Sequence, residues 1–411
     1  MRFRVPLRWI AIGIFLFSST LNYLDRQILG TVAVIWRIHP EFPFNYADYG
    51  ILLERFSIAY AVSAPLMGLF LDWAGLNAGI CISVFLWSGI SILTGNIHSF
   101  GQLVWYRTAL GAVEASGISA FGKAIGTYLL PKERAVGHAL SQVGLSVGAA
   151  IAPLLAAYLA WRHAFYLAGI FGFAWIPIWL ITAAKIRPTS TDATERPRVM
   201  TQWEMLADKR LWAMIAANFL SMTFYSLWTN WTPAYLEHVY HLTAKEAANY
   251  AWVVPIAGYV GAFICGSLSW RLVARGMAAV EARKRVCLLT ASAILLSLGI
   301  PLLPNPLLAT IGMSFSFFCI AGWSTNLYTL PIDIYGAERA AFGVSGQVFA
   351  YGLMQAVVSR RMGQVIEQYG FQPVLYTFAL LPLAGYLLLW LFVRKPVKES
   401  HPESDRIALA R

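Results

Sequence analysis

Long apolar segments recur along the whole chain and constrain its fold more than any other feature. Each is close to the roughly 20 residues that an α-helix needs to cross the hydrocarbon core of a bilayer. Lipid offers no hydrogen-bonding partners to the backbone, so segments of this length are stable there as helices. We therefore predict an all-α integral membrane protein. The twelve expected spans are residues 8–34, 48–71, 79–97, 101–122, 136–160, 164–184, 211–235, 247–270, 286–303, 306–331, 342–359 and 372–393.

The composition supports this class and explains the charge. Hydrophobic residues make up 58% of the chain and charged residues 12%, which excludes an ordinary soluble protein. Most of the 31 Lys and Arg residues fall at the chain ends and in alternate connections, which places both termini in the cytoplasm. The net charge of +11 then reflects membrane topology, and no nucleic-acid partner is expected. The expected surroundings are the lipid bilayer of a cell inner membrane, with the protein as a monomer.

Cysteine and histidine residues give no sign of a cofactor, a metal site or an enzyme. The four Cys residues lie in expected spans at unrelated spacings, and the seven His residues are scattered. Metal sites need several such ligands at suitable spacings. We expect no cofactor and no enzymatic activity.

The middle of the chain divides the spans into six and six. Residues 185–210 form the longest polar stretch between spans, so we expect an N-terminal bundle over 1–184, a linker over 185–210, a C-terminal bundle over 211–394 and a cytoplasmic tail over 395–411. The segment Glu133-Arg134-Ala135 is echoed by Glu338-Arg339-Ala340, half a chain later. A parallel repeat of six helices is typical of transporters that bind substrate between pseudo-symmetric halves.

Four ionisable residues interrupt the expected spans. Asp25 and Arg26 lie in the first span, and Arg107 and Glu114 lie in the fourth. Charged groups at membrane depth cost at least about 2.5 kcal/mol each and usually mark a substrate or proton path. We therefore expect these residues to be functional.

The spacing of Arg107 and Glu114 indicates how they are used. Seven residues turn a helix through almost two revolutions, so both side chains share one face with their Cα atoms about 10 Å apart. That is too far for a direct ion pair, so Asp25 and Arg26 are expected to supply the opposite charges. The carboxyl groups could carry protons, and the planar guanidinium suits a substrate carboxylate. The alternative is a buried charge network that only holds the first and fourth spans together.

Several polar and aromatic residues are predicted at similar depth and could bind the hydroxyl groups of a small solute. Buried tyrosines in membrane helices also commonly bond to a neighbouring carbonyl, so each residue alone is a weak indication. The short polar cluster around Trp323 is the most suggestive. The candidates are Tyr23, Tyr60, Tyr225, Trp323, Asn326 and Gln347.

These motifs together resemble one family. Asn22-Tyr23-Leu24-Asp25-Arg26, Tyr60-Ala61, Trp87-Ser88, the segment Arg107–Ala115 and Trp323-Ser324-Thr325-Asn326 are similar to the anion:cation symporter family of the major facilitator superfamily, and within it to hexuronate transporters. The resemblance implies proton-coupled uptake of a small organic anion, a sugar acid such as a hexuronate or an aldonate, by alternating access. It implies that Asp25 and Glu114 carry protons. It assigns Arg26 and Arg107 to the substrate carboxylate and to coupling, and Tyr23 and Tyr60 to the substrate pocket.

The expected gates depart from the family pattern. The loop after the second span keeps Gly68 and Asp72 but lacks the usual basic residues. Asp72 is still expected to close the cytoplasmic side as a weaker latch. Glu54 and Arg55 add a charged pair in the second span. They form either an outer gate or anion contact or, as the preferred interpretation, a local ion pair that reaches the interface.

Two other functions fit the same sequence. An exporter or uniporter of another small organic solute would keep the fold without needing the arginines. A sensor that binds solute without transporting it would carry the same residues.

Overall fold

The structure is a computed structural model, and it describes residues 7–38, 43–129, 134–186, 202–335 and 337–393. Helices account for nearly all of these residues, and none of them lies in a strand. The elements are α1 (Leu7–Ile38), α2 (Tyr46–Ala74), α3 (Leu76–Gly95), α4 (Phe100–Glu114), α5 (Ser116–Tyr128), α6 (Arg134–Tyr158), α7 (Trp161–Ala183), α8 (Gln202–Leu206), α9 (Lys209–Tyr240), α10 (Ala244–Ala251), α11 (Val253–Ala274), α12 (Ala279–Ile294), η2 (Leu295–Leu302), α13 (Pro306–Tyr335), α14 (Ala337–Tyr369) and α15 (Gln372–Phe392).

The helices follow the twelve expected spans in order. This requires counting α4 with α5, α10 with α11, and α12 with the 3-10 helix η2 as one span each, and leaving out the short α8. Within the described residues, nine helical segments are long and apolar enough to cross a membrane by themselves. The fourth span is broken at Ala115, directly after Glu114. The connection between the second and third spans, expected over residues 72–78, is a single residue, Gly75. Its φ of 76° is in the left-handed region that glycine adopts readily.

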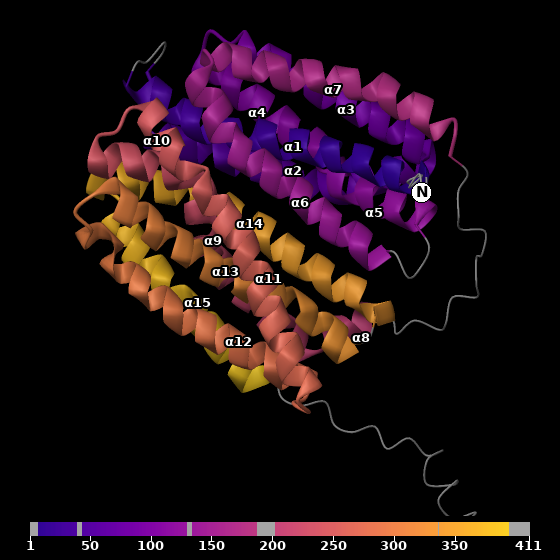
Figure 1. Cartoon of the computed structure of the whole chain (residues 1–411), viewed down its shortest axis with the longest axis vertical. Helices are drawn as coiled ribbons and strands as arrows, with labels where there is room; N and C mark the ends of the chain where they lie inside the picture. Colours follow the sequence, from indigo (N-terminus) through magenta and orange to yellow (C-terminus); the bar gives the residue numbers. More distant parts are fainter. Residues whose placement is uncertain (1–6, 39–42, 130–133, 187–201, 336, 394–411) are drawn as a thin grey trace, which may run out of the picture.

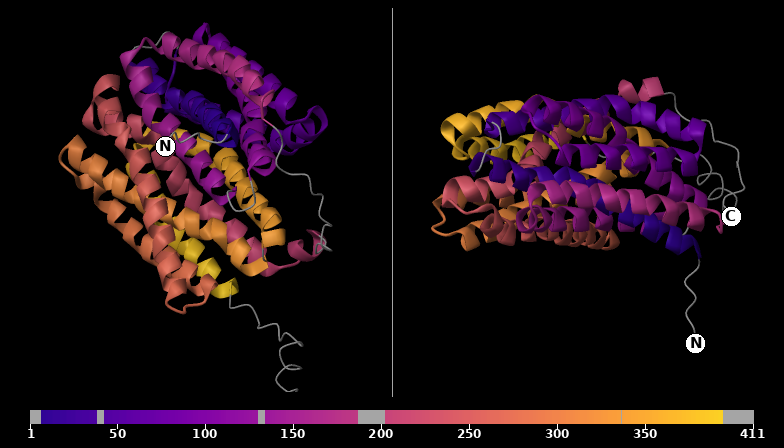
Figure 2. Two further views of the ribbon diagram at one scale, coloured as in Figure 1. Left: turned by 45° about the vertical axis from the view of Figure 1, so that its right-hand side comes forward. Right: turned by 90° about the horizontal axis from the view of Figure 1, so that it is seen from above.

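The helices form two groups that lie side by side with their axes roughly parallel. Helices α1–α7 make up one group and α8–α15 the other, as the change from indigo and magenta to orange and yellow shows (Figures 1 and 2). The groups meet mainly where α2 packs on α14, where α1 packs on α9 and where α6 packs on α10 and α11. The predicted domain limits stay a prediction, because residues 187–201 of the linker and the tail 395–411 lie outside the described residues. So do Glu133 and the side chains of the Glu338-Arg339-Ala340 repeat.

Two glycines allow α2 and α14 to approach each other closely. A Cβ atom on Gly50 of α2 would lie 2.6 Å from the carbonyl oxygen of Ser359 on α14. A Cβ atom on Gly363 of α14 would meet the carbonyl oxygen of Tyr46. Small residues at membrane helix interfaces permit this backbone contact. The two groups are therefore tightly packed near the start of α2 and the end of α14.

Candidate functional site

Helices α1 and α4 bring the four ionisable residues together. We call Asp25, Arg26, Arg107 and Glu114 the Arg26 cluster. The Nη2 atom of Arg26 lies 3.2 Å from Oε2 of Glu114, in an ion pair whose glutamate side chain is fully buried and whose arginine side chain is 21% exposed. This is the pairing between spans that the seven-residue spacing predicts. The carboxylate of Asp25 accepts a hydrogen bond of 2.6 Å from the Ser91 hydroxyl on α3.

Arg107 has a different partner from the one expected. Its guanidinium donates to the backbone carbonyl oxygens of Arg26 at 3.1 Å and of Asp25 at 3.5 Å. The expected ion pair with the Asp25 carboxylate is not formed in the described structure. A carbonyl group bears only a partial negative charge, so Arg107 is held less strongly than by a carboxylate. Arg107 fixes the α1 backbone at Asp25 and Arg26.

Aromatic rings surround the guanidinium of Arg26. Its Cζ atom lies 4.7 Å from the ring centroid of Phe56, 4.9 Å from that of Tyr60 and 5.4 Å from that of Tyr23. Cations are attracted to aromatic faces at these distances. The rings therefore hold the cation beside Glu114 and leave the side chain partly exposed.

The second group of helices completes this surface. The hydroxyl groups of Tyr23 on α1 and Tyr225 on α9 interact, and the Tyr225 ring lies 6.3 Å from that of Tyr351 on α14. Gln355 donates to the Tyr351 hydroxyl at 3.1 Å. Tyr351 and Gln355 were not predicted from the sequence, although they lie one and two turns beyond Gln347 on the same helix. Both helix groups thus contribute to one polar, tyrosine-rich surface.

Two atoms of the ion pair keep unused hydrogen-bonding capacity. Nε of Arg26 and Oε1 of Glu114 are buried and make no hydrogen bond in the described structure. An unpaired buried polar group costs about 1–3 kcal/mol, so a ligand that satisfies it binds more tightly. A planar guanidinium with a free N–H edge can take a carboxylate.

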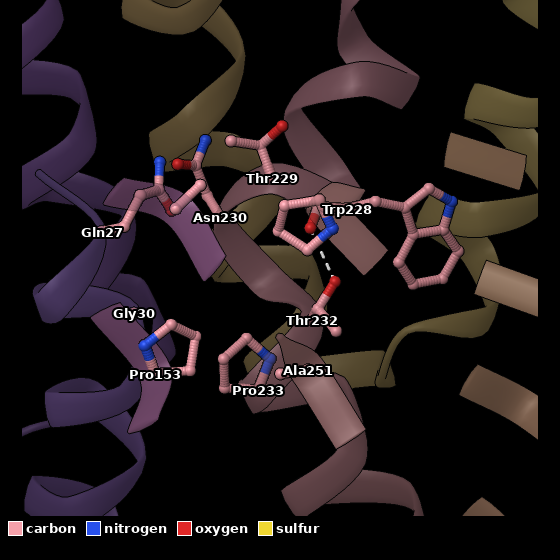
Figure 3. A pocket seen from close by; sticks show the side chains of 11 residues that line it. Gln27, Gly30, Pro153, Trp228, Thr229, Asn230, Thr232, Pro233 and Ala251 are labelled. Atoms are coloured by element: carbon pink, nitrogen blue, oxygen red, sulfur yellow. Dashed lines mark hydrogen bonds between the residues drawn. The ribbon is translucent and has the colours of Figure 1, made fainter. Parts of the chain in front are cut away.

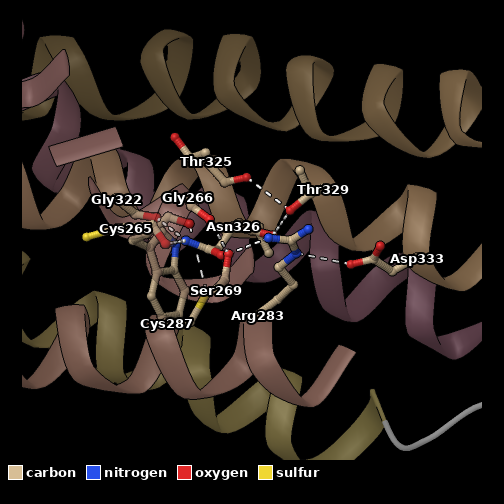
Figure 4. Close-up of polar contacts among 12 residues, drawn as sticks. Cys265, Gly266, Ser269, Arg283, Cys287, Gly322, Thr325, Asn326, Thr329 and Asp333 are labelled. Atoms are coloured by element: carbon tan, nitrogen blue, oxygen red, sulfur yellow. Dashed lines mark hydrogen bonds and ion pairs between the residues drawn. The ribbon is translucent and has the colours of Figure 1, made fainter. Parts of the chain in front are cut away.

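Three other predicted residues lie elsewhere. Trp323, Asn326 and Gln347 are fully buried among helices of the second group. The Asn326 amide donates to the carbonyl oxygens of Gly322 and Cys265 (Figure 4). The Gln347 amide donates to the carbonyl oxygen of Leu327. These contacts join helices to one another, and none of the three side chains meets the Arg26 cluster in the described structure.

An ion pair between Arg283 of α12 and Asp333 of α13 lies close to Asn326 (Figure 4). The two side chains are 3.2 Å apart and less than one-fifth exposed.

Removing one partner of the Arg283–Asp333 ion pair leaves the other charge largely buried and without a counter-charge. We expect Asp333→Asn to lower the free energy of unfolding by about 1–3 kcal/mol. Thermal unfolding of the purified protein in detergent measures this. Glu204→Gln is the control, because Glu204 is exposed on α8 and makes no ion pair in the described structure. Equal unfolding temperatures for both variants would contradict the expectation.

A second charged cluster closes the opposite end of the helices from the start of α1. Its members are Arg37, Tyr46, Glu237 and Glu367, which we call the Arg37 cluster. Arg37 lies 3.0 Å from Glu367 on α14 and 3.6 Å from Glu237 on α9. The backbone N–H of Tyr46 donates to Glu367, and its hydroxyl donates to Glu237. The ends of α1 and α2 are thereby tied to the ends of α9 and α14.

The gate residues predicted from the sequence do not form this closure. Glu54 and Arg55 make no ion pair with each other in the described structure, which therefore lacks the local pair of the preferred interpretation. Adjacent residues on a helix point in different directions. Arg55 is exposed, and Oε2 of Glu54 is buried without a hydrogen bond in the described structure. The side chain of Asp72 lies outside the described residues.

The Arg37 cluster was missed although the sequence contains a signal for it. Arg37, Glu237 and Glu367 each lie within a few residues of a helix end, and the predicted topology places all three ends on one side of the membrane. Opposite charges at helix ends on one face could have suggested a contact. Sequence spacing does not tell which ends are neighbours.

A family model described as Major Facilitator Superfamily matches residues 15–359. The chain belongs to this superfamily. It is 27% identical over 421 residues to the hexuronate transporter of Escherichia coli (strain K12), with 97% of each chain covered. It is 26% identical over 412 residues to a probable L-galactonate transporter of the same organism, with 95% of this chain and 89% of the relative covered.

The fold is also that of solved superfamily members. A bacterial homologue of the human lysosomal transporter Spinster, in an inward-facing and unoccupied conformation, matches with a TM-score of 0.75 at 21% identity and 95% coverage of each chain. The predicted fold class and family resemblance are confirmed. This superfamily member is a multi-pass membrane transporter and not an enzyme.

Proposed function

We propose that this transporter imports a sugar acid, a hexuronate or an aldonate, together with protons, by alternating access. The observation that carries the proposal is the Arg26–Glu114 ion pair, with unused hydrogen-bonding capacity, on a tyrosine-rich surface shared by both helix groups. The names of the relatives, a hexuronate and a probable L-galactonate transporter, support the same substrate class.

Arg26 binds the substrate carboxylate in this proposal. The Arg26 side chain is partly exposed, and the guanidinium fork matches a carboxylate in two parallel hydrogen bonds, one of which would come from the unpaired Nε. Tyr23, Tyr60, Tyr225 and Tyr351 surround that position and offer hydroxyl groups to the hydroxyls of a sugar acid. The predicted contacts from Trp323, Asn326 and Gln347 would require these buried side chains to turn out of their present packing.

Glu114 and Asp25 carry the protons. Glu114 and the substrate carboxylate compete for the same guanidinium, since Glu114 occupies Nη2 of Arg26 at 3.2 Å. Protonation of Glu114 removes its negative charge and frees Arg26 for the substrate. Loss of the proton restores the ion pair and releases the substrate. This competition for Arg26 is sufficient to couple proton movement to substrate movement.

Both termini lie in the cytoplasm in this proposal, so the Arg37 cluster lies on the outer side of the membrane. There it holds the two helix groups together and closes the transporter to the outside. The two predicted six-helix bundles then move against each other around the Arg26 cluster, as parallel-repeat transporters do. In the structure the outer ends of α1, α2, α9 and α14 are bonded together. Opening to the outside must break those bonds. The protein acts as a monomer in the inner membrane.

Weakening the Arg37 cluster should favour the outward-open state. We expect Arg37→Gln to increase labelling of Ser359→Cys by a membrane-impermeant maleimide about threefold to fivefold, since partly exposed ion pairs contribute up to about 1 kcal/mol. Ser359 is fully buried on α14 against Gly50. The four native cysteines are replaced beforehand. Arg361→Gln is the control, because Arg361 is exposed near the same end and contacts only Gln364 in the described structure. Unchanged labelling in Arg37→Gln would show that the cluster does not hold the outer side closed.

Uptake into proteoliposomes tests the function itself. Radiolabelled glucuronate, galacturonate and galactonate are supplied outside, with the interior more alkaline or at equal pH. The proposal requires accumulation of at least one of them that depends on the pH gradient. Equilibration of a sugar acid regardless of the gradient would indicate a uniporter, and transport of none of them would exclude this substrate class.

A further inference from the structure

A small cavity between the two helix groups lies one turn from Arg26 toward the Arg37 cluster. Its walls come from α1 and α6 on one side and from α9, α10 and α11 on the other, with Gln27 and Gly30 lining it from α1 (Figure 3). The cavity measures about 20 Å³. A single water molecule needs roughly 10–15 Å³, so one water fits and a larger ligand does not.

Three prolines point to the chemistry of this cavity. Pro153 of α6, Pro233 of α9 and Pro255 of α11 all line it, and the rings of Pro153 and Pro233 face each other (Figure 3). Proline has no N–H, so each ring deprives the carbonyl group four residues earlier of its helical partner. The residues four positions earlier are Ala149, Thr229 and Ala251, and each of them also lines the cavity. No side chain of the described structure donates to these three carbonyl oxygens.

Two polar side chains that can donate hydrogen bonds complete the lining. Gln27 is more than nine-tenths buried, and its Nε2 atom makes no hydrogen bond in the described structure. Oγ1 of Thr229 is likewise buried and without a partner. The cavity therefore combines three carbonyl acceptors with an amide donor and a hydroxyl group.

We propose that the cavity binds one water molecule that bridges the two helix groups. Water donates two hydrogen bonds to the freed carbonyl oxygens and accepts one from Gln27, which fits the observed set of groups. A sodium ion would need acceptors only. The Gln27 donor, the lack of a carboxylate among the lining residues and the neighbouring guanidinium of Arg26 all disfavour a cation.

The water acts as a latch of the outer closed state. Ala149 and Gln27 belong to one helix group, and Thr229 and Ala251 belong to the other, so separation of the groups breaks the bridge. The proposal that a water binds depends only on the cavity, and a structure tests it. The effect of the water on opening also depends on the proposed function of alternating access, and labelling tests that effect.

Gln27→Met tests the latch, because it keeps the length of the side chain and removes the donor. We expect labelling of Ser359→Cys from the outside to rise about fivefold, the effect of losing one hydrogen bond. Pro153→Ala should act in the same direction from another helix, since it returns an N–H to the Ala149 carbonyl. Gln372→Met, at an exposed position, is the control. Unchanged labelling in both cavity variants, with wild-type unfolding temperatures, would overturn the latch.

A high-resolution structure of the wild-type protein tests the water itself. Density is expected within hydrogen-bonding distance of Nε2 of Gln27 and at least two of the three carbonyl oxygens, and it should be lost in Gln27→Met. Thermal stability is compared in sodium, potassium and choline chloride at equal ionic strength. Equal stability supports water, whereas stabilisation by sodium alone would replace the water with a cation and overturn the assignment.

Discussion

Arg26→Gln is expected to lower the initial rate of sugar-acid uptake at least about a hundredfold, because two charge-assisted hydrogen bonds to the substrate, each contributing about 1.5–3 kcal/mol, would be lost. Glu114 would also be left buried without its ionic partner. Initial uptake rates in proteoliposomes measure the effect. The result distinguishes a transporter of carboxylates from one that carries an uncharged solute in the same fold.

The control variants separate the role of Arg26 in binding from its role in packing. Arg26→Lys keeps the charge but loses the planar fork, so we expect partial recovery of the rate. Arg275→Gln removes an exposed charge at the end of α11 and should transport normally. If Arg26→Gln transports at the wild-type rate while remaining folded, the assignment of Arg26 to the substrate carboxylate is wrong.

The Arg26 cluster could be predicted because few charges interrupt the spans. When so few ionisable groups lie at membrane depth, each must satisfy its charge among the others or with backbone groups. The spacing of Arg107 and Glu114 then excluded a pair within α4, which left the pair between Arg26 and Glu114 that the structure contains. The choice of Arg107 between a carboxylate and backbone carbonyls depends on distances of a few ångströms, and sequence spacing cannot resolve them.

Asn326 and Trp323 show why the sequence predicts the depth of a residue in the membrane better than the direction in which its side chain points. Their position near the middle of α13 follows from counting residues along the helix. The face that they present does not, because the polar and apolar residues of α13 follow no helical period and so indicate no buried face. The structure turns both toward the interior of their helix group. The ends of α1, α2, α9 and α14 could not be paired for a related reason, since the Arg37 cluster depends on how the two groups dock.

Glu114→Gln is expected to abolish concentrative uptake while exchange of the substrate across the membrane persists. With the membrane potential clamped at zero, accumulation of a sugar acid that moves with protons depends on the pH gradient alone. Each pH unit can support about tenfold accumulation for each coupled proton, equivalent to about 1.4 kcal/mol. Glutamine cannot take up a proton, and it no longer competes with the substrate for Arg26. The accumulation ratio should therefore fall to about 1 at any pH gradient, as expected when no proton is coupled.

Counterflow and uptake must be measured on the same proteoliposomes to make this result informative. Wild-type and variant proteins should both exchange labelled for unlabelled substrate at equal pH, whereas only the wild type should accumulate substrate when the interior is alkaline. Glu204→Gln, an exposed substitution on α8, serves as the control and should accumulate normally. If Glu114→Gln still accumulates substrate in response to the pH gradient, the coupling proton is carried elsewhere, and Asp25 becomes the next carboxyl group to replace. If the variant loses exchange as well, Glu114 positions Arg26 for binding and the competition between the two carboxylates is not the coupling step.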